Sequence, residues 1–145
     1  MQDILINQLH EYIRQNDPDM LIVLEEEGSV TKYLSDKIST IDSLISQLQS
    51  EGNPPYLIEE ICMDILTKDL RPSRFNYICT VLEEDFENTF QQLRFSGTIK
   101  LEVINMITGC EPVFQQVGFT EENENSSLLR YAITGTISEY LSRQK

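Results

Sequence analysis

Residues 56–93 read YLIEEICMDILTKDLRPSRFNYICTVLEEDFENTFQQL, and their apolar pattern decides the fold class. Apolar residues recur at steps of three and four, which is the periodicity of an amphipathic helix. The first stripe consists of Leu57, Ile58, Ile61, Ile65 and Leu66, and the second of Phe75, Ile78, Cys79, Leu82, Phe86, Phe90 and Leu93. Arg71-Pro72-Ser73 stands between them, with Ser73 as the N-cap of the second. The stretch therefore predicts two helices around a tight corner.

The same periodicity predicts three more helices toward the N-terminus. The first covers about residues 2–15 and ends where Asp17 can cap and Pro18 can begin a short second helix. The third, residues 30–48, is the most regular. Its apolar ridge consists of Val30, Leu34, Ile38, Ile41, Ile45 and Leu48. The stretch SEGNPPY, residues 50–56, then breaks the chain, because tandem prolines cannot continue a helix.

The tripeptide Gly-Thr-Ile occurs twice, at residues 97–99 and 135–137. In the first copy a new apolar stripe starts after the glycine, which predicts a turn followed by a helix. In the second copy the stripe runs through the tripeptide, so Gly135 lies inside a helix at a cost of about 1 kcal/mol relative to alanine. We expect Ala132 and Gly135 to be helix-packing residues that let a neighbouring helix approach closely. The alternative is that Gly135 leaves room for a ligand.

These patterns predict an all-α fold, a multihelical orthogonal or bundle-like single domain of about six to seven helices. The chain of 145 residues is about the length of one domain, and its hydrophobic fraction of 40% is enough for a packed core. We therefore assign residues 1–145 to one domain. A sub-division near 52–55 is the alternative.

The chain is strongly acidic. It has 24 Asp and Glu residues against 11 Lys and Arg, a formal net charge of −13. This charge repels nucleic-acid phosphates and anionic membranes and favours a basic protein partner. The N-terminus has no signal-peptide pattern and no window approaches 18 apolar residues, so we expect a cytoplasmic protein without membrane contact. The cysteines, Cys62, Cys79 and Cys110, are odd in number and widely spaced, which favours core packing in a reducing compartment.

Few residues point to catalysis or to a cofactor. The single histidine is His10, and the sequence has no Cys-x-x-Cys, H-E-x-x-H, P-loop or G-x-G-x-x-G motif. The acidic run at 83–87 is interpreted as a solvated helix face rather than a metal site. We therefore predict no catalytic residues, no metal and no cofactor.

One local excess of positive charge, TKDLRPSRF, is a candidate anion-binding site consisting of Lys68, Arg71, Ser73 and Arg74. Amide groups at a helix N-terminus together with guanidinium groups suit a carboxylate or phosphate. The alternative is that Ser73 only caps and the basic side chains pair with surface carboxylates. A DNA-binding helix-turn-helix over 57–68 and 73–87 is opposed by the acidic run in its second helix.

Three segments together resemble a family of small uncharacterised bacterial proteins classified only as a domain of unknown function. They are DPDMLIVLEEEGS, DILTKDLRPSRFNYICTVLEEDF and RYAITGTISEYL. Ser73, Arg74 and Phe75 match the family's turn of serine, basic and aromatic residue, and residues 134–137 match its Thr-Gly-Thr-Ile. The segment 94–110 departs from the family pattern. The resemblance implies an all-helical fold and a setting in bacterial mobile elements, and it implies no activity.

The leading functional hypothesis is a non-enzymatic protein-interaction or regulatory module of a bacterial cytoplasm. An acidic decoy for a DNA-binding protein, with carboxylates in place of phosphates, is an alternative from the net charge. An enzyme that uses paired carboxylates is a second alternative, because Asp and Glu are plentiful. A homodimer is expected as well, because the ridge of residues 30–48 has more apolar surface than one small domain covers.

Overall fold

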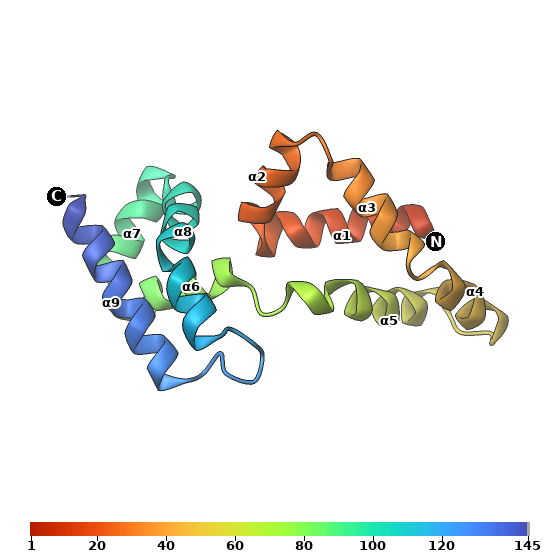
Figure 1. Ribbon diagram of the computed structural model, residues 1–145. Coiled ribbons are helices and arrows are strands. Elements are labelled where there is room, and N and C mark those ends of the chain that lie inside the picture. The colour runs from red at the N-terminus through yellow and green to blue at the C-terminus, as the bar shows by residue number, and fades with distance from the viewer. Residues whose placement is uncertain (145) are drawn as a thin grey trace. The chain divides into compact units, whose positions relative to one another are not determined.

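The computed structural model describes residues 1–144, which form helices and their connections, so the predicted all-α class is confirmed (Figure 1). The α-helices are α1 (Gln2–Asn16), α2 (Pro18–Glu26), α3 (Val30–Ser39), α4 (Asp42–Ser50), α5 (Pro55–Thr67), α6 (Arg74–Asp85), α7 (Glu87–Ser96), α8 (Ile99–Val117) and α9 (Ser127–Arg143). A short 3-10 helix, η1 (Lys68–Leu70), follows α5. The predicted number of six to seven helices is therefore wrong for the described residues, which contain nine α-helices.

One additional helix arises because the predicted helix 30–48 is broken into α3 and α4. The break follows Ser39, where the backbone N–H of Thr40 bonds the carbonyl of Lys37 at 3.1 Å and the Thr40 hydroxyl bonds the same carbonyl at 2.6 Å. These three-residue bonds tighten and end the helix. Ile41 is buried although it lies in the break. The apolar stripe thus continues across the interruption, and periodicity alone does not reveal it.

The other additional helix arises at Phe86, which divides the predicted helix 73–93 into α6 and α7. Phe86 has φ −135° and ψ 49°, outside the helical region. A straight helix over this range would extend about 30 Å. The break instead lets both Phe86 and Phe90 pack on one core.

The helices form two compact units, the first from Met1 to Arg71 and the second from Pro72 onward. The boundary coincides with the corner that the sequence predicts before Ser73. It does not lie near 52–55, which connects α4 to α5 inside the first unit. The assignment of the whole chain to one domain stays a prediction.

In the first unit α1 packs against α2, α3 and α5, and α4 packs against α5 (Figure 1). The buried core consists of Leu5, Leu9, Ile13, Leu21, Leu34, Ile38, Ile41, Ile45, Ile58, Cys62 and Leu66. Most of the ridge 30–48 lies in this core, so it does not offer the uncovered apolar face from which we expected a homodimer. The homodimer stays a prediction without that support.

In the second unit α8 packs against α6, α7 and α9, and α6 also packs against α9 (Figure 1). The buried core consists of Ile78, Val81, Leu82, Phe90, Val103, Met106, Ile107, Cys110, Phe114, Leu129, Ile133 and Ile137. The segment 94–110, whose helices the sequence leaves least defined, supplies the end of α7 and the first part of the 19-residue helix α8. α8 therefore connects the elements of this unit.

The cysteines are free thiols, as expected for core residues. Cys62 and Cys110 are buried and Cys79 is half-buried. Burial raises the pKa of Cys110 to about 11, and burial together with the charge of Glu83 raises the pKa of Cys79 to about 11. The thiolate is therefore disfavoured at both positions.

The two Gly-Thr-Ile copies differ in structure. Gly97 ends α7 with φ 76°, a left-handed conformation that glycine adopts without strain. Gly135 lies inside α9 and is exposed, and a Cβ there would meet no heavy atom within 4 Å. The interpretation of Gly135 as a close helix-crossing contact is therefore wrong. Ala132 is half-buried on the same helix.

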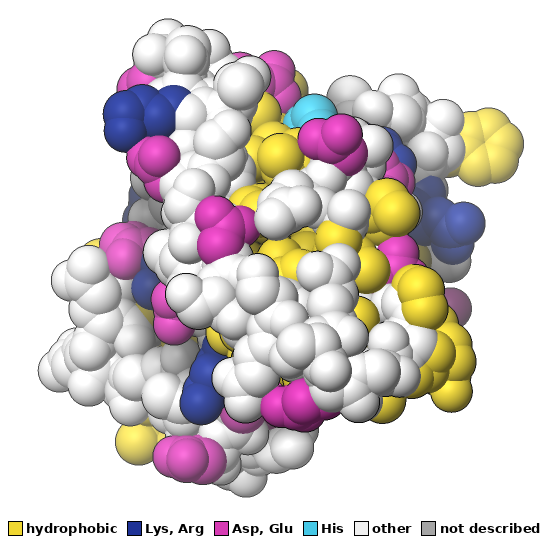
Figure 2. Space-filling model, turned by 90° about the vertical axis from the view of Figure 1, so that its right-hand side faces the viewer, with side chains coloured by type: hydrophobic (Ala, Val, Ile, Leu, Met, Phe, Trp, Pro, Cys, Tyr) yellow, Lys and Arg dark blue, Asp and Glu magenta, His cyan; other side chains and the backbone are white. Residues whose placement is uncertain are grey.

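Large hydrophobic side chains are exposed in both units. They are Ile4, Ile22, Val23, Tyr56 and Ile65 in the first unit, and Phe95, Leu101, Leu128 and Tyr131 in the second. Figure 2 shows one face of the molecule, on which hydrophobic side chains gather near the middle among acidic ones. None of the helices within residues 1–144 combines the length and apolar character needed to cross a bilayer.

Gly135→Ala is expected to stabilise the protein by up to about 1 kcal/mol, because alanine restores helix propensity at an open position. Gly97→Ala is the matched control and should destabilise the protein by about 1–2 kcal/mol, because its φ is 76°. Thermal unfolding of both variants in one buffer provides the measurement. A lower melting temperature for Gly135→Ala would contradict the exposed position of this residue.

The α1–α2 corner contains a carboxyl group with an unusual environment. Asp17 occupies the N-cap position of α2, but its side chain makes no capping hydrogen bond, and its Oδ2 atom is buried without a partner. Desolvation, with a smaller effect of the neighbouring Asp19 charge, raises its pKa from 3.8 to about 7. The folded state therefore holds this proton more tightly than the unfolded chain does.

The stabilising effect of tighter proton binding at Asp17 is fully present below pH 3.8, the pKa of the unfolded chain. It is lost as the pH rises through about 7, the pKa in the folded state. Asp17→Asn should remove this loss and make the variant more stable than the wild type at pH 8. Because the side chain is partly exposed, we expect a difference on the order of 1 kcal/mol. Urea unfolding of both proteins between pH 4 and pH 8 measures it. Parallel stability curves for the two proteins would show that Asp17 does not titrate abnormally.

Candidate functional site

The residues of the predicted anion site are largely committed to contacts within the protein. Ser73 caps α6, its Oγ atom accepting a bond from the Asn76 amide at 3.0 Å. Arg71 donates to the Asp64 carboxylate at 3.0 Å, and Arg74 pairs with Glu111. These contacts agree with the alternative of capping and pairing.

Lys68 is exposed in η1 of the first unit, whereas Ser73 and Arg74 belong to the second. The Arg74 guanidinium also lies 4.9 Å from the centre of the Phe114 ring. Anion binding by the four residues stays a prediction.

A groove of about 500 Å³ in the second unit is the better candidate. It lies beside α6, the start of α9 and the loop before α9. Its lining residues are Tyr77, Asp85, Glu124, Asn125, Ser126, Ser127, Arg130, Tyr131 and Thr134. The lining side chains carry hydroxyl, amide, carboxylate and guanidinium groups, and two tyrosines supply aromatic surface. The groove therefore suits a polar ligand or a peptide.

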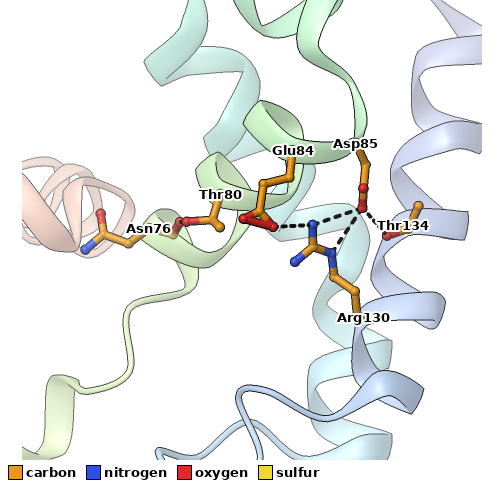
Figure 3. Close-up of polar contacts among 6 residues, drawn as sticks. All are labelled: Asn76, Thr80, Glu84, Asp85, Arg130 and Thr134. Atoms are coloured by element: carbon orange, nitrogen blue, oxygen red, sulfur yellow. Dashed lines mark hydrogen bonds and ion pairs between the residues drawn. The ribbon is translucent and has the colours of Figure 1, made fainter.

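Figure 3 shows that Arg130 of α9 reaches Glu84 and Asp85 at the end of α6. Its Nε and Nη2 atoms donate to Asp85 Oδ2 at 3.1 and 3.0 Å, and Nη2 also donates to Glu84 Oε1 at 3.0 Å. The Thr134 hydroxyl reaches the same Asp85 oxygen at 3.4 Å. Desolvation lowers the pKa of Arg130, but the bonds and charges of Glu84 and Asp85 outweigh it and raise that pKa above its usual value. The side chain thus joins α9 to the end of α6.

The loop between α8 and α9 also lines the groove, and hydrogen bonds of Asn123 fix the shape of this loop. The Asn123 Oδ1 atom accepts from the Thr120 amide at 2.7 Å, and Nδ2 donates to the Gly118 carbonyl at 2.7 Å. Ser126 then caps α9, its Oγ accepting from the Leu129 amide at 3.4 Å. These bonds hold Glu124 at the groove.

Tyr77 lines the groove, but its polar group lies beneath the surface. Its ring packs edge-on against Phe119 with the centroids 5.1 Å apart. Its hydroxyl oxygen is buried and has no hydrogen-bond partner. Leaving such a group unpaired costs about 1–3 kcal/mol. Burial raises the pKa of Tyr77, and the nearby positive charge of Arg130 cancels part of this rise.

The charge of the groove is negative. Two carboxylates, those of Asp85 and Glu124, face one guanidinium, that of Arg130, which Glu84 shares. Glu124 is half-buried and makes no ion pair or hydrogen bond with the residues that the structure describes. No three His, Cys, Asp or Glu side chains of the described chain are grouped so as to hold a metal ion. The groove thus has an excess of negative charge.

The sequence did not identify this site. The sequence predicts that Glu84 and Asp85 belong to a solvated helix face. Both are exposed, yet both bind Arg130. The pairs join residues 45 and 46 positions apart, a separation that no local spacing rule covers. Two features of the sequence point toward this contact. They are the acidic end of one predicted helix, Glu84 and Asp85, and Arg130 near the start of another.

Arg130→Gln is expected to lower the free energy of unfolding by about 1 kcal/mol, because it leaves Glu84 and Asp85 adjacent without a cation. Arg143→Gln is the control, since Arg143 makes only an exposed pair at 3.7 Å with Glu139 within one helix. Urea unfolding at low and high salt measures both. Equal stability of the two variants would mean that the Arg130 cluster is energetically neutral.

Among curated proteins and solved structures, comparison finds no match to this chain. A family model, however, matches residues 6–145. That range includes the corner before Ser73, the groove residues and the second Gly-Thr-Ile. The predicted resemblance is thereby confirmed, and the chain belongs to the family described as a domain of unknown function (DUF1896).

Proposed function

We propose that the protein is a protein-interaction module and that the groove of the second unit binds a basic segment of a partner protein. The observation that carries the proposal is the presence at one groove of an exposed tyrosine, Tyr131, and of a carboxylate without an ion pair among the described residues, Glu124. Tyr131 lines the groove and is 77% exposed, and Leu128, one helical turn away, is 67% exposed. Tyrosine at such a position is typical of residues that dominate binding energy.

The polar lining supports a peptide as the ligand. The hydroxyl groups of Ser127 and Thr134 and the side-chain amide of Asn125 can bond main-chain groups of an extended segment. The negative groove of a chain with net charge −13 attracts a basic partner and speeds the encounter. The exposed side chains of Tyr131 and Leu128 and the carboxylate of Glu124 together favour one kind of peptide segment. In such a segment a basic residue lies near an aliphatic or aromatic one.

The other hypotheses from the sequence stay predictions. An acidic decoy needs carboxylates spaced like phosphates, whereas Glu84 and Asp85 are engaged by Arg130. An enzyme with paired carboxylates needs two carboxyl groups placed on either side of a substrate bond, and this hypothesis also stays a prediction. A cytoplasmic location, a bacterial source and a homodimer likewise stay predictions.

Selection from a display library of short random peptides tests the proposed function. We expect enriched peptides to contain lysine or arginine next to an apolar residue, and Tyr131→Ser to weaken their binding about tenfold or more. Phe95→Ser is the control, because Phe95 is 98% exposed and lies outside the groove. Peptides without basic residues, or equal losses for the two variants, would contradict the proposal.

A further inference from the structure

We infer that the corner between α7 and α8 is a further interaction surface, which inserts Phe95 into an apolar pocket of a folded partner protein whose pocket rim carries carboxylates. This α7–α8 corner consists of Arg94, Phe95, Lys100 and Leu101, all of them exposed. None of these residues lines the groove, so the inference goes beyond the proposed function and does not rest on it.

Phe95 is the most exposed large hydrophobic side chain within residues 1–144. Its exposed fraction is 98%, and that of Leu101, on the other side of the turn, is 60%. A phenyl ring that projects this far is not covered by a flat surface, whereas an apolar pocket encloses it. Aromatic side chains that insert into pockets supply much of the binding energy at protein interfaces. Phe95 is therefore the inserting group, and the partner supplies the pocket.

Hydrogen bonds order the backbone of the α7–α8 corner before a partner binds. The Thr98 amide donates to the Leu93 carbonyl at 3.1 Å. The Gly97 amide donates to the Arg94 carbonyl at 3.2 Å, which completes the Schellman arrangement that ends a helix. Leu93 and Ile99, on either side of the turn, pack against the core of the second unit. The exposed phenyl ring is thus carried by ordered backbone, which reduces the entropy lost on binding.

The α7–α8 corner is a positive region in an acidic chain. Residues 88–101 contain Arg94 and Lys100 but no aspartate or glutamate. Within residues 1–144, the basic side chains that form no ion pair with a described carboxylate are Lys68, Arg94 and Lys100. The surplus of carboxylates in this chain thus pairs with most of its cations but leaves both cations of the α7–α8 corner available.

The structure also shows how these cations stay available. The Arg94 guanidinium lies 5.6 Å from the centre of the Phe90 ring, so an aromatic face holds it instead of a carboxylate. The acidic residue that follows Leu101, Glu102, accepts a hydrogen bond from the Tyr140 hydroxyl at 2.6 Å. Charge complementarity therefore favours a partner whose carboxylates surround its apolar pocket.

The local positive charge suits a compact acidic rim better than an extended polyanion. At physiological salt, charges are screened beyond about 8 Å, so a compact rim interacts mainly with Arg94 and Lys100. A nucleic acid or an anionic bilayer extends further and meets the rest of a chain with net charge −13. A second copy that docked through the same corner would bring like charges together. A folded acidic partner is therefore the favoured occupant.

Two cyclic hosts, titrated into the full chain and followed by NMR, test the α7–α8 corner. β-Cyclodextrin has an apolar cavity that encloses a phenyl ring, and carboxymethyl-β-cyclodextrin adds carboxylates to the rim of the same cavity. We expect the carboxymethyl host to bind about fivefold more tightly and to shift the amide signals of residues 94–101. Phe95→Ser should abolish binding of both hosts at this corner. The double variant Arg94→Gln, Lys100→Gln should bind both hosts equally.

Tyr56→Ser is the matched control, because Tyr56 is an exposed aromatic residue of the first unit. It should leave host binding at the α7–α8 corner unchanged. Equal affinity of the two hosts for the wild type, or a preference for the carboxymethyl host that persists in the double variant, would overturn the inference. Short linear peptides have no pocket and do not sample this surface, so the peptide selection at the groove and the host titration can fail separately.

The other occupants give different results with the same Phe95→Ser variant. Sedimentation of the 16.8 kDa chain at tens of micromolar concentration would identify a second copy, if the wild type forms a dimer and the variant does not. Binding of single-stranded DNA or of phosphatidylserine vesicles by the wild type, lost in the variant, would identify a polyanion. Either result would overturn the assignment to a folded acidic partner, and we expect neither.

Discussion

Arg130 joins two helix ends that each carry charge of the unfavourable sign. Glu84 and Asp85 are the last residues of α6, where a negative charge opposes the helix dipole, and Arg130 lies near the start of α9, where a positive charge does so. Their contacts at 3.0 Å place the guanidinium at the end of α6 and the carboxylates beside the first turns of α9. Each helix end thereby gains from its neighbour a charge of the favourable sign, typically 0.3–1 kcal/mol per group. The packing of α6 against α9 turns two local conflicts into one tertiary contact.

The shape of the groove depends on this contact and on a second set of polar contacts in the loop that carries Glu124. Arg130 orients Asp85, and Asn123 braces the loop that carries Glu124. Side chains held in this way lose little conformational freedom when a ligand binds, which favours affinity. The buried Leu129 and Ile133 of α9 anchor the same helix to the core. The core therefore positions α9, and the polar contacts shape its accessible side.

Most of the fold could be predicted from the sequence because the helices follow local apolar periodicity, as at Leu5, Leu9 and Ile13 of α1. The interruptions at Ile41 and Phe86 could not, because each is itself an apolar member of the stripe and its side chain still packs on a core. Gly135 shows the opposite error. A small residue on a helix face predicts a close contact, but the same pattern occurs where a face is open to solvent, and only the tertiary arrangement distinguishes the two.

The candidate site was less predictable than the fold for a related physical reason. Helix formation is decided among residues three and four positions apart, whereas Arg130 meets Asp85 across 45 positions. In an acidic chain each arginine has many carboxylates as candidate partners, so composition does not select one. Once α6 and α9 pack, however, the choice is limited to the carboxylates at the end of α6. The excess of 24 acidic over 11 basic residues then leaves carboxylates such as Glu124 without a cation among the described residues, and it is this local surplus, not the overall charge, that makes the groove a candidate site.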